Sequence, residues 1–508
     1  MPQKAHRELL EKIKRGEIST HSELEKAKTA LAGKYALPNI MKNAELIAYA
    51  GKNDFHDAIA LLKTKPVRTL SGVANIAIMW LGKNSYSCPF SCIFCPQGEY
   101  SPKSYTGVEP TTLRAKRNEY DAFEQVLNRL KQLNGIGHVT DKCELIIMGG
   151  TFMAWDKLNR ENFIKRAFDA FNGKDSQSLE DAKALNETAK NRVIGLTIET
   201  RADYCNDAYI NEMLRYGTTR VEIGVQTTDE ELQKAVNRGH GCEKNKEAFR
   251  RLREAGLKIT AHWMPGLTGL TGKVDAMKEL ELFALLFSDP DYRPDELKIY
   301  PTLVIPGTEL HKKWKTGEYA PLEKEEMIAL LIQMKKTVPP YIRIKRIMRD
   351  ISEHKAEAGA KTTNLRQLAA ERGMKCRCIR CREVGVSGRT PKNIGLLENE
   401  YEAGGGQEIF LSFEDKEQNI LIGFLRLRID ESSTAKVREV HVYGAQVPIH
   451  GEGAYQHKGY GRRLLERAEE IAKERGKVKI AVTSGVGARE YYKKFGYKLD
   501  GYYMVKYF

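Results

Sequence analysis

The middle of the chain alternates short apolar runs with longer amphipathic stretches, and this pattern predicts a parallel sheet. The amphipathic stretches have helical periodicity, so each run and the stretch after it predict a βα unit. Repeated βα units build a parallel sheet that closes, partly or fully, into a TIM-type barrel. The predicted strands lie at residues 76–81, 144–148, 193–198, 220–225, 257–262 and 296–300.

Polar residues gather where the predicted strands end. In βα barrels the carboxyl ends of the strands carry the chemistry. Each residue alone could be a core residue or part of a turn, but together they favour a site at this end of the barrel. They are Gly149-Gly150-Thr151, Glu199-Thr200-Arg201, Gln226-Thr227, His262–Gly266 and Lys298.

The two ends of the chain follow other patterns. Residues 1–70 alternate helical patterns with short breaks and are mildly basic, which predicts a helical segment that either contacts nucleic acid or packs as an appendage. Near the other end, a glycine-containing loop from Gln456 to Arg463 leads into a predicted helix at 464–475. Unpaired N–H groups at such a helix start bind pyrophosphate, although an ordinary glycine-rich turn looks the same. Antiparallel strands are predicted at 409–413, 420–428 and 437–443, with a later strand at 479–483.

Three cysteines, Cys88, Cys92 and Cys95, follow the first predicted strand. Three thiolates can hold three irons of a [4Fe-4S] cluster and leave the fourth iron open to a small ligand. A radical S-adenosylmethionine (SAM) enzyme requires such an open iron, because SAM binds to it. Phe94 between the last two cysteines also fits that pattern. The alternatives are a zinc site with a distant fourth ligand and three buried thiols.

A second triplet, Cys376, Cys378 and Cys381, lies within residues 311–390. Thiolates at this spacing can converge on one zinc ion, which then needs a fourth ligand. His354 is the candidate, and the alternative for it is a basic surface residue that contacts phosphate. A zinc ion with four protein ligands would be structural and would stabilise the fold of a small basic linker.

The amino-acid composition indicates the cellular compartment and the class of binding partner. The 508 residues are 41% hydrophobic and 29% charged, and no apolar run is long enough for a transmembrane helix, so a soluble cytoplasmic protein of several domains is expected. Six of the nine cysteines fall in the two triplets, which indicates cofactor chemistry in a reducing compartment. The net charge of +15 predicts a polyanionic partner, and residues 335–382 carry 14 Lys and Arg against 4 Asp and Glu. A homodimer is compatible with the sequence, which implies no accessory subunit.

Several motifs resemble those of known families. Gly149-Gly150 resembles the glycine-rich element beneath SAM in radical SAM proteins, and Gln456–Gly461 resembles the acetyl-CoA loop of the GCN5-related N-acetyltransferases (GNAT). Together the two parts resemble the catalytic subunits of Elongator in their archaeal form, from about residue 71 to Phe508. The stretches that carry this likeness are 104–110, IIMGGTF (146–152), ETRAD (199–203), VEIGVQT (221–227), LKIYPTLVI (297–305), VREVHVYG (437–444) and VTSGVG (482–487).

With this resemblance, the expected fold is an α/β multidomain protein. Its expected parts are a basic helical tRNA-binding segment (1–70), a radical SAM TIM-type barrel, partial or complete (71–310), a basic linker with a zinc site (311–390) and a C-terminal GNAT acetyltransferase domain (391–508). The resemblance implies that SAM radical chemistry and acetyl-CoA install a carboxymethyl group at C5 of the wobble uridine of tRNA. The enzyme would hold the tRNA by its anticodon stem-loop.

The resemblance also implies roles for single positions. Lys298 and Tyr300 match positions near the radical chamber or the tRNA. Tyr491 or Tyr492 could protonate the CoA thiolate or hold the thioester, or either could be a buried aromatic. Gly149, Gly150 and Glu199 would contact SAM. The positions that match the acetyl-CoA site are Lys142, Glu439, Val440, His441, Val442, Gln456, Gly459, Tyr460, Gly461, Arg462 and Tyr492.

Two features depart from the family pattern, and two other functions stay open. Cys88 and Cys92 are closer in sequence than in many members, and not every member retains the triplet at 376–381. A protein-lysine acetyltransferase with a structural cluster is one alternative, and a tRNA-binding scaffold with degenerate sites is the other. Only the radical enzyme would form 5′-deoxyadenosine and add a carboxymethyl mass to uridine.

Overall fold

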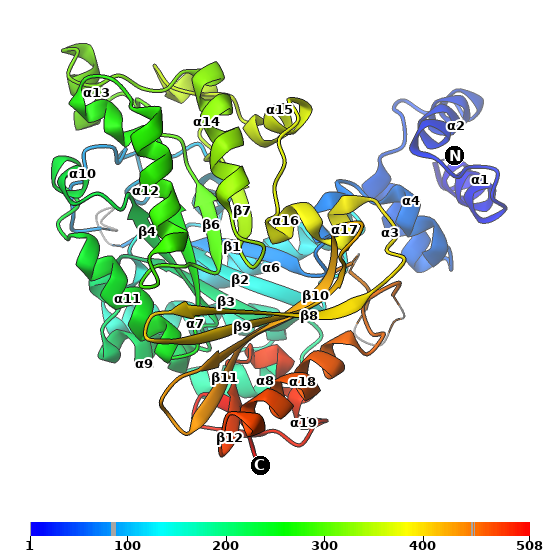
Figure 1. Ribbon diagram of the computed structural model, residues 1–508. Helices are drawn as coiled ribbons and strands as arrows, with labels where there is room; N and C mark the ends of the chain where they lie inside the picture. The colour runs from blue at the N-terminus through cyan, green and yellow to red at the C-terminus, as the bar shows by residue number, and fades with distance from the viewer. Residues whose placement is uncertain (1, 83–87, 445, 449–450, 452) are drawn as a thin grey trace.

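The computed structural model describes residues 2–82, 88–444, 446–448, 451 and 453–508. It has three parts, which Figure 1 colours in chain order: a small helical N-terminal domain, a parallel α/β domain and a C-terminal domain built on a mostly antiparallel sheet. Within the described residues, no helix combines the length and the apolar character that crossing a membrane requires.

Seven parallel strands form the sheet of the α/β domain, in the order of the chain. Their outward side chains are apolar and join the main core, whereas many inward side chains are charged. β1 and β7 are the two edges of the sheet, so of the two predicted forms, partial and complete, the barrel is the partial one. The strands are β1 (Ala74–Met79), β2 (Lys142–Met148), β3 (Arg192–Thr200), β4 (Arg220–Gln226), β5 (Lys258–Trp263), β6 (Glu296–Ile299) and β7 (Arg343–Ile347).

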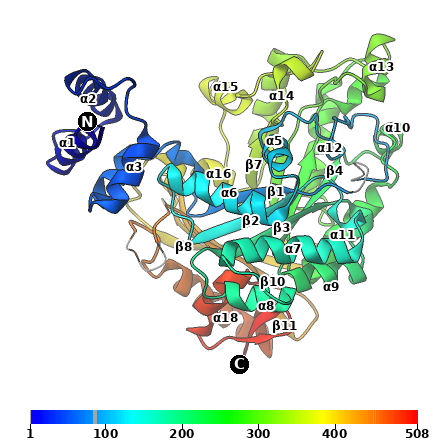
Figure 2. The same cartoon turned by 180° about the vertical axis from the view of Figure 1, so that it is seen from behind.

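Helices connect these strands and cover the outer face of the sheet (Figure 2). They are α5 (Pro110–Arg117), α6 (Ala122–Gly135), α7 (Lys157–Asn172), α8 (Leu179–Asn186), α9 (Asp207–Tyr216), α10 (Glu230–Ala235), α11 (Cys242–Glu254), α12 (Ala276–Ser288), α13 (Glu309–Lys315) and α14 (Lys324–Thr337). Three short helices follow β7: α15 (Leu365–Glu371), α16 (Ile379–Arg382) and α17 (Val384–Ser387).

The sequence pattern does not predict β7. This strand lies within residues 311–390, which are expected to form a linker, and Ile344 of β7 pairs with Leu297 of β6. Its sequence, Arg-Ile-Lys-Arg-Ile, lacks an apolar run because the charged Arg343 and Lys345 alternate with the apolar residues. The expected linker therefore supplies the last strand of the barrel.

The C-terminal sheet has the strand order β13-β14-β12-β11-β10-β9-β8. β9, β10 and β11 are antiparallel neighbours, as predicted. β11 pairs with β12 in parallel from Thr434 to Val437, where β12 ends, so the rest of β11 extends beyond β12. The elements are β8 (Gly395–Ala403), β9 (Gly406–Asp415), β10 (Ile420–Ile429), β11 (Thr434–Val442), α18 (Tyr460–Glu474), β12 (Lys479–Val482), α19 (Arg489–Lys493), β13 (Lys498–Asp500) and β14 (Tyr503–Tyr507).

Buried charges join the C-terminal sheet to the amino ends of the barrel strands. Arg438 of β11 makes two hydrogen bonds to Asp295, of 2.6 and 2.8 Å, and a third of 3.1 Å to the carbonyl of Leu257. The loop after β12 also touches β3, because a Cβ on Gly485 would lie 2.1 Å from the carbonyl oxygen of Ile194. The two sheets share one hydrophobic core.

The N-terminal domain has a core of its own. Its helices are α1 (Pro2–Lys14), α2 (His21–Lys34), α3 (Asn43–Lys52) and α4 (Ile59–Leu62). Figure 1 shows α1 and α2 set apart from the two sheets, whereas α3 contacts α6.

Candidate active site

The three cysteines after β1 line a cavity at the carboxyl ends of the barrel strands. Cys88, Cys92 and Cys95 share this cavity with Gly150, Glu199 and Tyr300. Cys92 is buried, and the other two thiols are partly exposed. Among the described residues, these three thiols are not a group whose sulfurs all lie within 4.8 Å of one another. This wider arrangement suits a multi-iron cluster better than a single zinc ion.

Two arginines face the thiol of Cys92. Arg238 Nη1 lies 3.7 Å from its sulfur, and Arg201 Nη1 lies 3.9 Å from it. A hydrogen bond from Cys95 and these two cations lower the pKa of Cys92 to about 5. The pKa of Cys95 rises, because its partner thiolate and burial both favour the neutral thiol. Since metals bind thiolates, the arginines favour the form of Cys92 that an iron ion binds.

The glycine pair after β2 lets the backbone approach this cavity. Gly149 has φ +121°, and a Cβ on it would lie 2.9 Å from the Trp80 ring, so a larger residue does not fit. Its N–H donates a 3.3 Å hydrogen bond to Glu199 Oε2, which also accepts one of 3.2 Å from the Tyr105 hydroxyl. The structure therefore brings three predicted SAM-contacting residues, Gly149, Gly150 and Glu199, to one wall.

A buried ion-pair network lies next to Glu199. Lys298 is bonded to Glu222 and lies 3.8 Å from Glu199 Oε1. His262 Nε2 lies 3.1 Å from Glu222 Oε2. Glu222 and the neighbouring phenol of Tyr300 raise the pKa of Lys298 despite burial. Lys298 therefore stays a cation and does not act as a base.

A second cavity, of about 370 Å³, lies at the opposite, amino end of the barrel strands. Glu439, Val440 and His441 of β11 line it from the C-terminal domain. From the barrel side it is lined by charged residues near the strand starts, which are Glu144, Arg220, Lys258, Glu296, Arg343 and Lys345. Its volume lies within the range of small-molecule sites.

The N-terminus of α18 carries the remaining predicted acetyl-CoA residues. Gly459 is its N-cap, and Tyr460, Gly461 and Arg462 begin the helix, where amide groups are free to bind an anion. A Cβ on Gly461 would lie 2.8 Å from the Tyr491 hydroxyl, so this tyrosine reaches the helix start.

Tyr492 is buried beside Tyr491, with ring centroids 5.3 Å apart. Burial raises the pKa of Tyr491 to about 12 and that of Tyr492 further, so both phenols remain protonated. Gln456 is turned toward β11, where it donates to the Val442 carbonyl at 3.2 Å and accepts from Lys142 at 3.0 Å.

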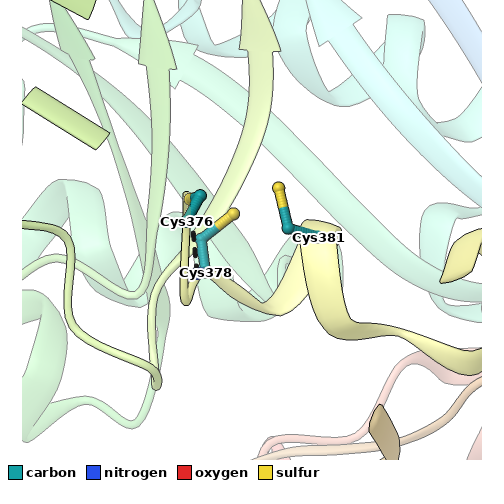
Figure 3. Close-up of side chains that lie close together, drawn as sticks. All are labelled: Cys376, Cys378 and Cys381. Carbon is teal, nitrogen blue, oxygen red and sulfur yellow. Dashed lines mark hydrogen bonds between the residues drawn. The ribbon is translucent and has the colours of Figure 1, made fainter. Parts of the chain in front are cut away.

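The second cysteine triplet forms a compact group. Ligand atoms of Cys376, Cys378 and Cys381 all lie within 4.8 Å of one another, and Figure 3 shows them on α16 and the loop before it. The buried Lys335 places its ammonium 3.6 Å from the sulfur of Cys381. His354 is exposed, and the structure does not bring it into this group of described residues, so the expected fourth ligand needs correction.

The basic stretch 335–382 is only partly a surface feature. Its exposed cations are Lys336, Lys355, Arg372, Lys375 and Arg377, whereas the other lysines and arginines are buried or half-buried. Charge density in the sequence therefore overstates the surface available to phosphates, because β7 turns Arg343 and Lys345 into the barrel.

The sequence analysis misses several residues of these cavities. Arg220 and Glu222 lie on β4, whereas Lys345 comes from β7, so no local motif marks the contact between Glu222 and Lys345. Charged residues alternate with apolar ones in each of their strands, and this alternation is the available signal for a polar barrel interior.

Comparisons with known proteins agree with this architecture. Family models match the ELP3 N-terminal domain at residues 3–70, the Radical SAM superfamily at 85–280, the Radical SAM C-terminal domain at 294–375 and the Acetyltransferase (GNAT) family at 385–497. The model at 294–375 covers the segment that carries β7.

Relatives match over nearly the full length. The tRNA uridine(34) acetyltransferase of Methanocaldococcus jannaschii is 47% identical over 92% of this chain and 90% of its own. Human Elongator complex protein 3 is 42% identical over 95% and 93%. The solved archaeal Methanocaldococcus infernus Elp3 with N-terminus deletion (1-46) aligns with a TM-score of 0.76 and 42% identity, covering 87% of this chain and 100% of that chain. The chain therefore belongs to the family of the tRNA uridine(34) acetyltransferases and Elongator complex protein 3.

Proposed function

We propose that this protein installs a carboxymethyl group at C5 of the wobble uridine of tRNA, using acetyl-CoA and SAM. Two cavities carry the proposal: the one lined by Cys88, Cys92 and Cys95 (the cysteine cavity) and the one lined by residues of β11 (the β11 cavity). They lie at the two ends of one polar barrel interior. An acetyltransferase alone has no need of a thiol-lined cavity facing its acyl site. The net change replaces one C–H bond of uridine and one of the acetyl methyl with a C–C bond, and water releases CoA. SAM is consumed to methionine and 5′-deoxyadenosine, which takes up one of the two hydrogens, and the other leaves as a proton whose electron is returned.

Cys88, Cys92 and Cys95 would hold a [4Fe-4S] cluster, and the donor set fits, because three thiols share one cavity beside two arginines. When bound, the cluster and SAM supply the 5′-deoxyadenosyl radical that breaking a methyl C–H bond requires. Gly149, Gly150 and Glu199 would orient SAM, since a backbone amide and a carboxylate can meet its amino and carboxylate groups.

Acetyl-CoA would bind along the free part of β11 and at the start of α18. Beyond Val437, β11 extends past the end of β12, so its backbone groups on that side can pair with the amide groups of the pantetheine arm. The first amides of α18 would bind the pyrophosphate. Tyr491 and Tyr492, both protonated, would donate to the thioester oxygen or to the departing thiolate.

The tRNA would bind at the mouth of the cysteine cavity, where Arg346 and Arg349 line the opening. The five exposed cations of residues 335–382 and the N-terminal helices would bind its phosphates. The target uridine must leave the stacked anticodon loop to enter the cavity. We place this reaction in the cytoplasm, which the nine free thiols favour.

We also propose zinc at Cys376, Cys378 and Cys381, which the sulfur spacing supports. The test is elemental analysis of anaerobically purified protein and of Cys378→Ser. One zinc per chain that is lost in the variant is expected. Full zinc content in the variant would disprove the assignment.

The test of the main function is an anaerobic reaction of the reconstituted protein with tRNA, SAM and acetyl-CoA. The expected products are 5′-deoxyadenosine and a carboxymethyl mass gain on uridine 34, both absent in Cys92→Ser. Acetyl-lysine on a protein substrate without SAM consumption would instead indicate a lysine acetyltransferase. Binding of tRNA with neither product would indicate a scaffold.

A further inference from the structure

A single layer of side chains separates the two cavities. Glu222 lines the cysteine cavity, and Lys345 lines the β11 cavity. Lys345 Nζ lies 3.7 Å from Glu222 Oε1, so these two groups face each other across the boundary. The barrel interior around them is polar, in contrast to the packed apolar interior of ordinary βα barrels.

The ammonium of Lys345 lies within ion-pair distance of three carboxylates but makes no hydrogen bond to the part of the chain that the structure describes. It lies 3.3 Å from Glu296 Oε2 and 3.7 Å from Glu144 Oε1, yet it has no hydrogen-bond partner within the described residues. Glu222 Oε1, which faces it, also lacks one. Lys298, one strand away, is by contrast hydrogen-bonded to Glu222. Lys345 also lines the β11 cavity, so a small anion there could supply the hydrogen bonds that the three carboxylates do not make.

The β11 cavity favours anions. Seven lysines and arginines line it against three glutamates. Such an excess of one sign inside low-dielectric walls concentrates the opposite charge. A carboxylate released near Glu439 would therefore be drawn toward the barrel and away from the solvent.

We infer, on the basis of the proposed function, that the barrel interior is a passage for free acetate and that Lys345 holds the acetate carboxylate at the crossing. Water cleaves the thioester of acetyl-CoA to acetate, the CoA thiol and a proton, which balances without any other reactant. The acetate then replaces Glu222 as the partner of Lys345 and enters the cysteine cavity with its methyl group leading. The close contact between Lys345 and Glu222 leaves no room for the pantetheine arm, so the small carboxylate crosses alone.

The first test measures acetate binding to cluster-free protein and so does not depend on the radical reaction. Line broadening of ¹³C-labelled sodium acetate is compared for wild type, Lys345→Met and the control Lys416→Met, an exposed lysine in the β9–β10 turn. Saturable broadening in wild type and the control, and its loss in Lys345→Met, is the expected result. Equal broadening in all three proteins would overturn the inference.

The second test measures coupling in the reconstituted enzyme, as carboxymethyluridine formed per CoA released. We expect this ratio to fall at least tenfold in Lys345→Met, with free acetate rising to match, and to stay at the wild-type value in Lys416→Met. The double variant Lys345→Met/Glu296→Gln removes one charge of each sign, so it keeps the interior neutral if the single variant does not fold.

The outcomes separate the two proposals. A wild-type ratio in the folded lysine variants would refute the passage while leaving the proposed function intact. Absence of carboxymethyluridine in wild type, together with wild-type acetate binding that depends on Lys345, would refute the function but retain the acetate site.

Discussion

The buried charges between the two sheets make a quantitative prediction about how firmly the domains are docked. Arg438 and Asp295 are both fully buried and form a two-point pair. Arg438 also donates to Glu408 at 2.7 and 2.9 Å, so the substitution Arg438→Met leaves two buried carboxylates without their main cation.

The expected cost is about 3–5 kcal/mol, which is typical when one partner of a buried ion pair is removed. This corresponds to a factor of roughly 10² to 10⁴ in the equilibrium between docked and separated sheets. Arg438→Met/Asp295→Asn should recover about 1–3 kcal/mol relative to the sum of the single variants, because no aspartate charge is left unpaired.

Hydrogen exchange measures this directly, on peptides that cover β5 and β11, because the Ile259 amide bonds to Asp295 at 2.9 Å. The control is Arg467→Met, whose partners Glu398 of β8 and Glu470 of α18 are exposed, so losing these ion pairs should cost at most about 1 kcal/mol. A change of less than tenfold in Arg438→Met, or no recovery in the double variant, would refute this account of the interface.

Three further results are expected. Cys92→Ser should lose most of its reconstituted iron and all 5′-deoxyadenosine formation; full iron content, measured by iron analysis, would contradict the cluster assignment. Tyr492→Phe should slow CoA release about 100-fold with little change in acetyl-CoA affinity, because a proton donor is lost. Chromatographic CoA assays on this variant and on Tyr491→Phe show which phenol is the donor. Wild-type rates of CoA release in both variants would exclude both phenols from this role. Burial and Arg220 lower the pKa of Lys345 to about 8, so its charge is present below pH 8 and lost above it. The coupling ratio should therefore fall between pH 7 and pH 9, and a ratio constant over this range would argue against a charged Lys345.

Much of the fold was predictable because the outward faces of most strands are continuous apolar runs. β4 illustrates this, since Val221, Ile223 and Val225 pack into the core. β7 and β8 lack such faces: Ile344 and Ile347 are the apolar residues of β7, beside Arg343, Lys345 and Arg346, and glutamates occupy one face of β8. A strand that buries charge or lies at a sheet edge gives a weak hydrophobic signal, and only its neighbours show its place.

The candidate site was predictable where its chemistry is local in sequence. The spacing of Cys88, Cys92 and Cys95 alone marks them as candidate ligands of a [4Fe-4S] cluster. The contact of Lys345 with Glu222 depends on sheet register between strands more than one hundred residues apart, which no single sequence reveals. For a similar reason His354 is absent from the group that Cys376, Cys378 and Cys381 form among the described residues, because a separation of 22 residues along the chain does not bring it to the thiols.

The glycine contact between the loop after β12 and the start of β3 restricts how this architecture can be altered. A Cβ on Gly487 would lie 2.9 Å from the backbone nitrogen of Val193, so the acyltransferase domain rests directly on the main chain of its neighbour. Grafting a different acyltransferase onto this barrel would therefore demand a matching pair of side-chain-free positions. The barrel and the acyltransferase domain would therefore have to be inherited together in evolution, because exchanging one of them alone would break this contact.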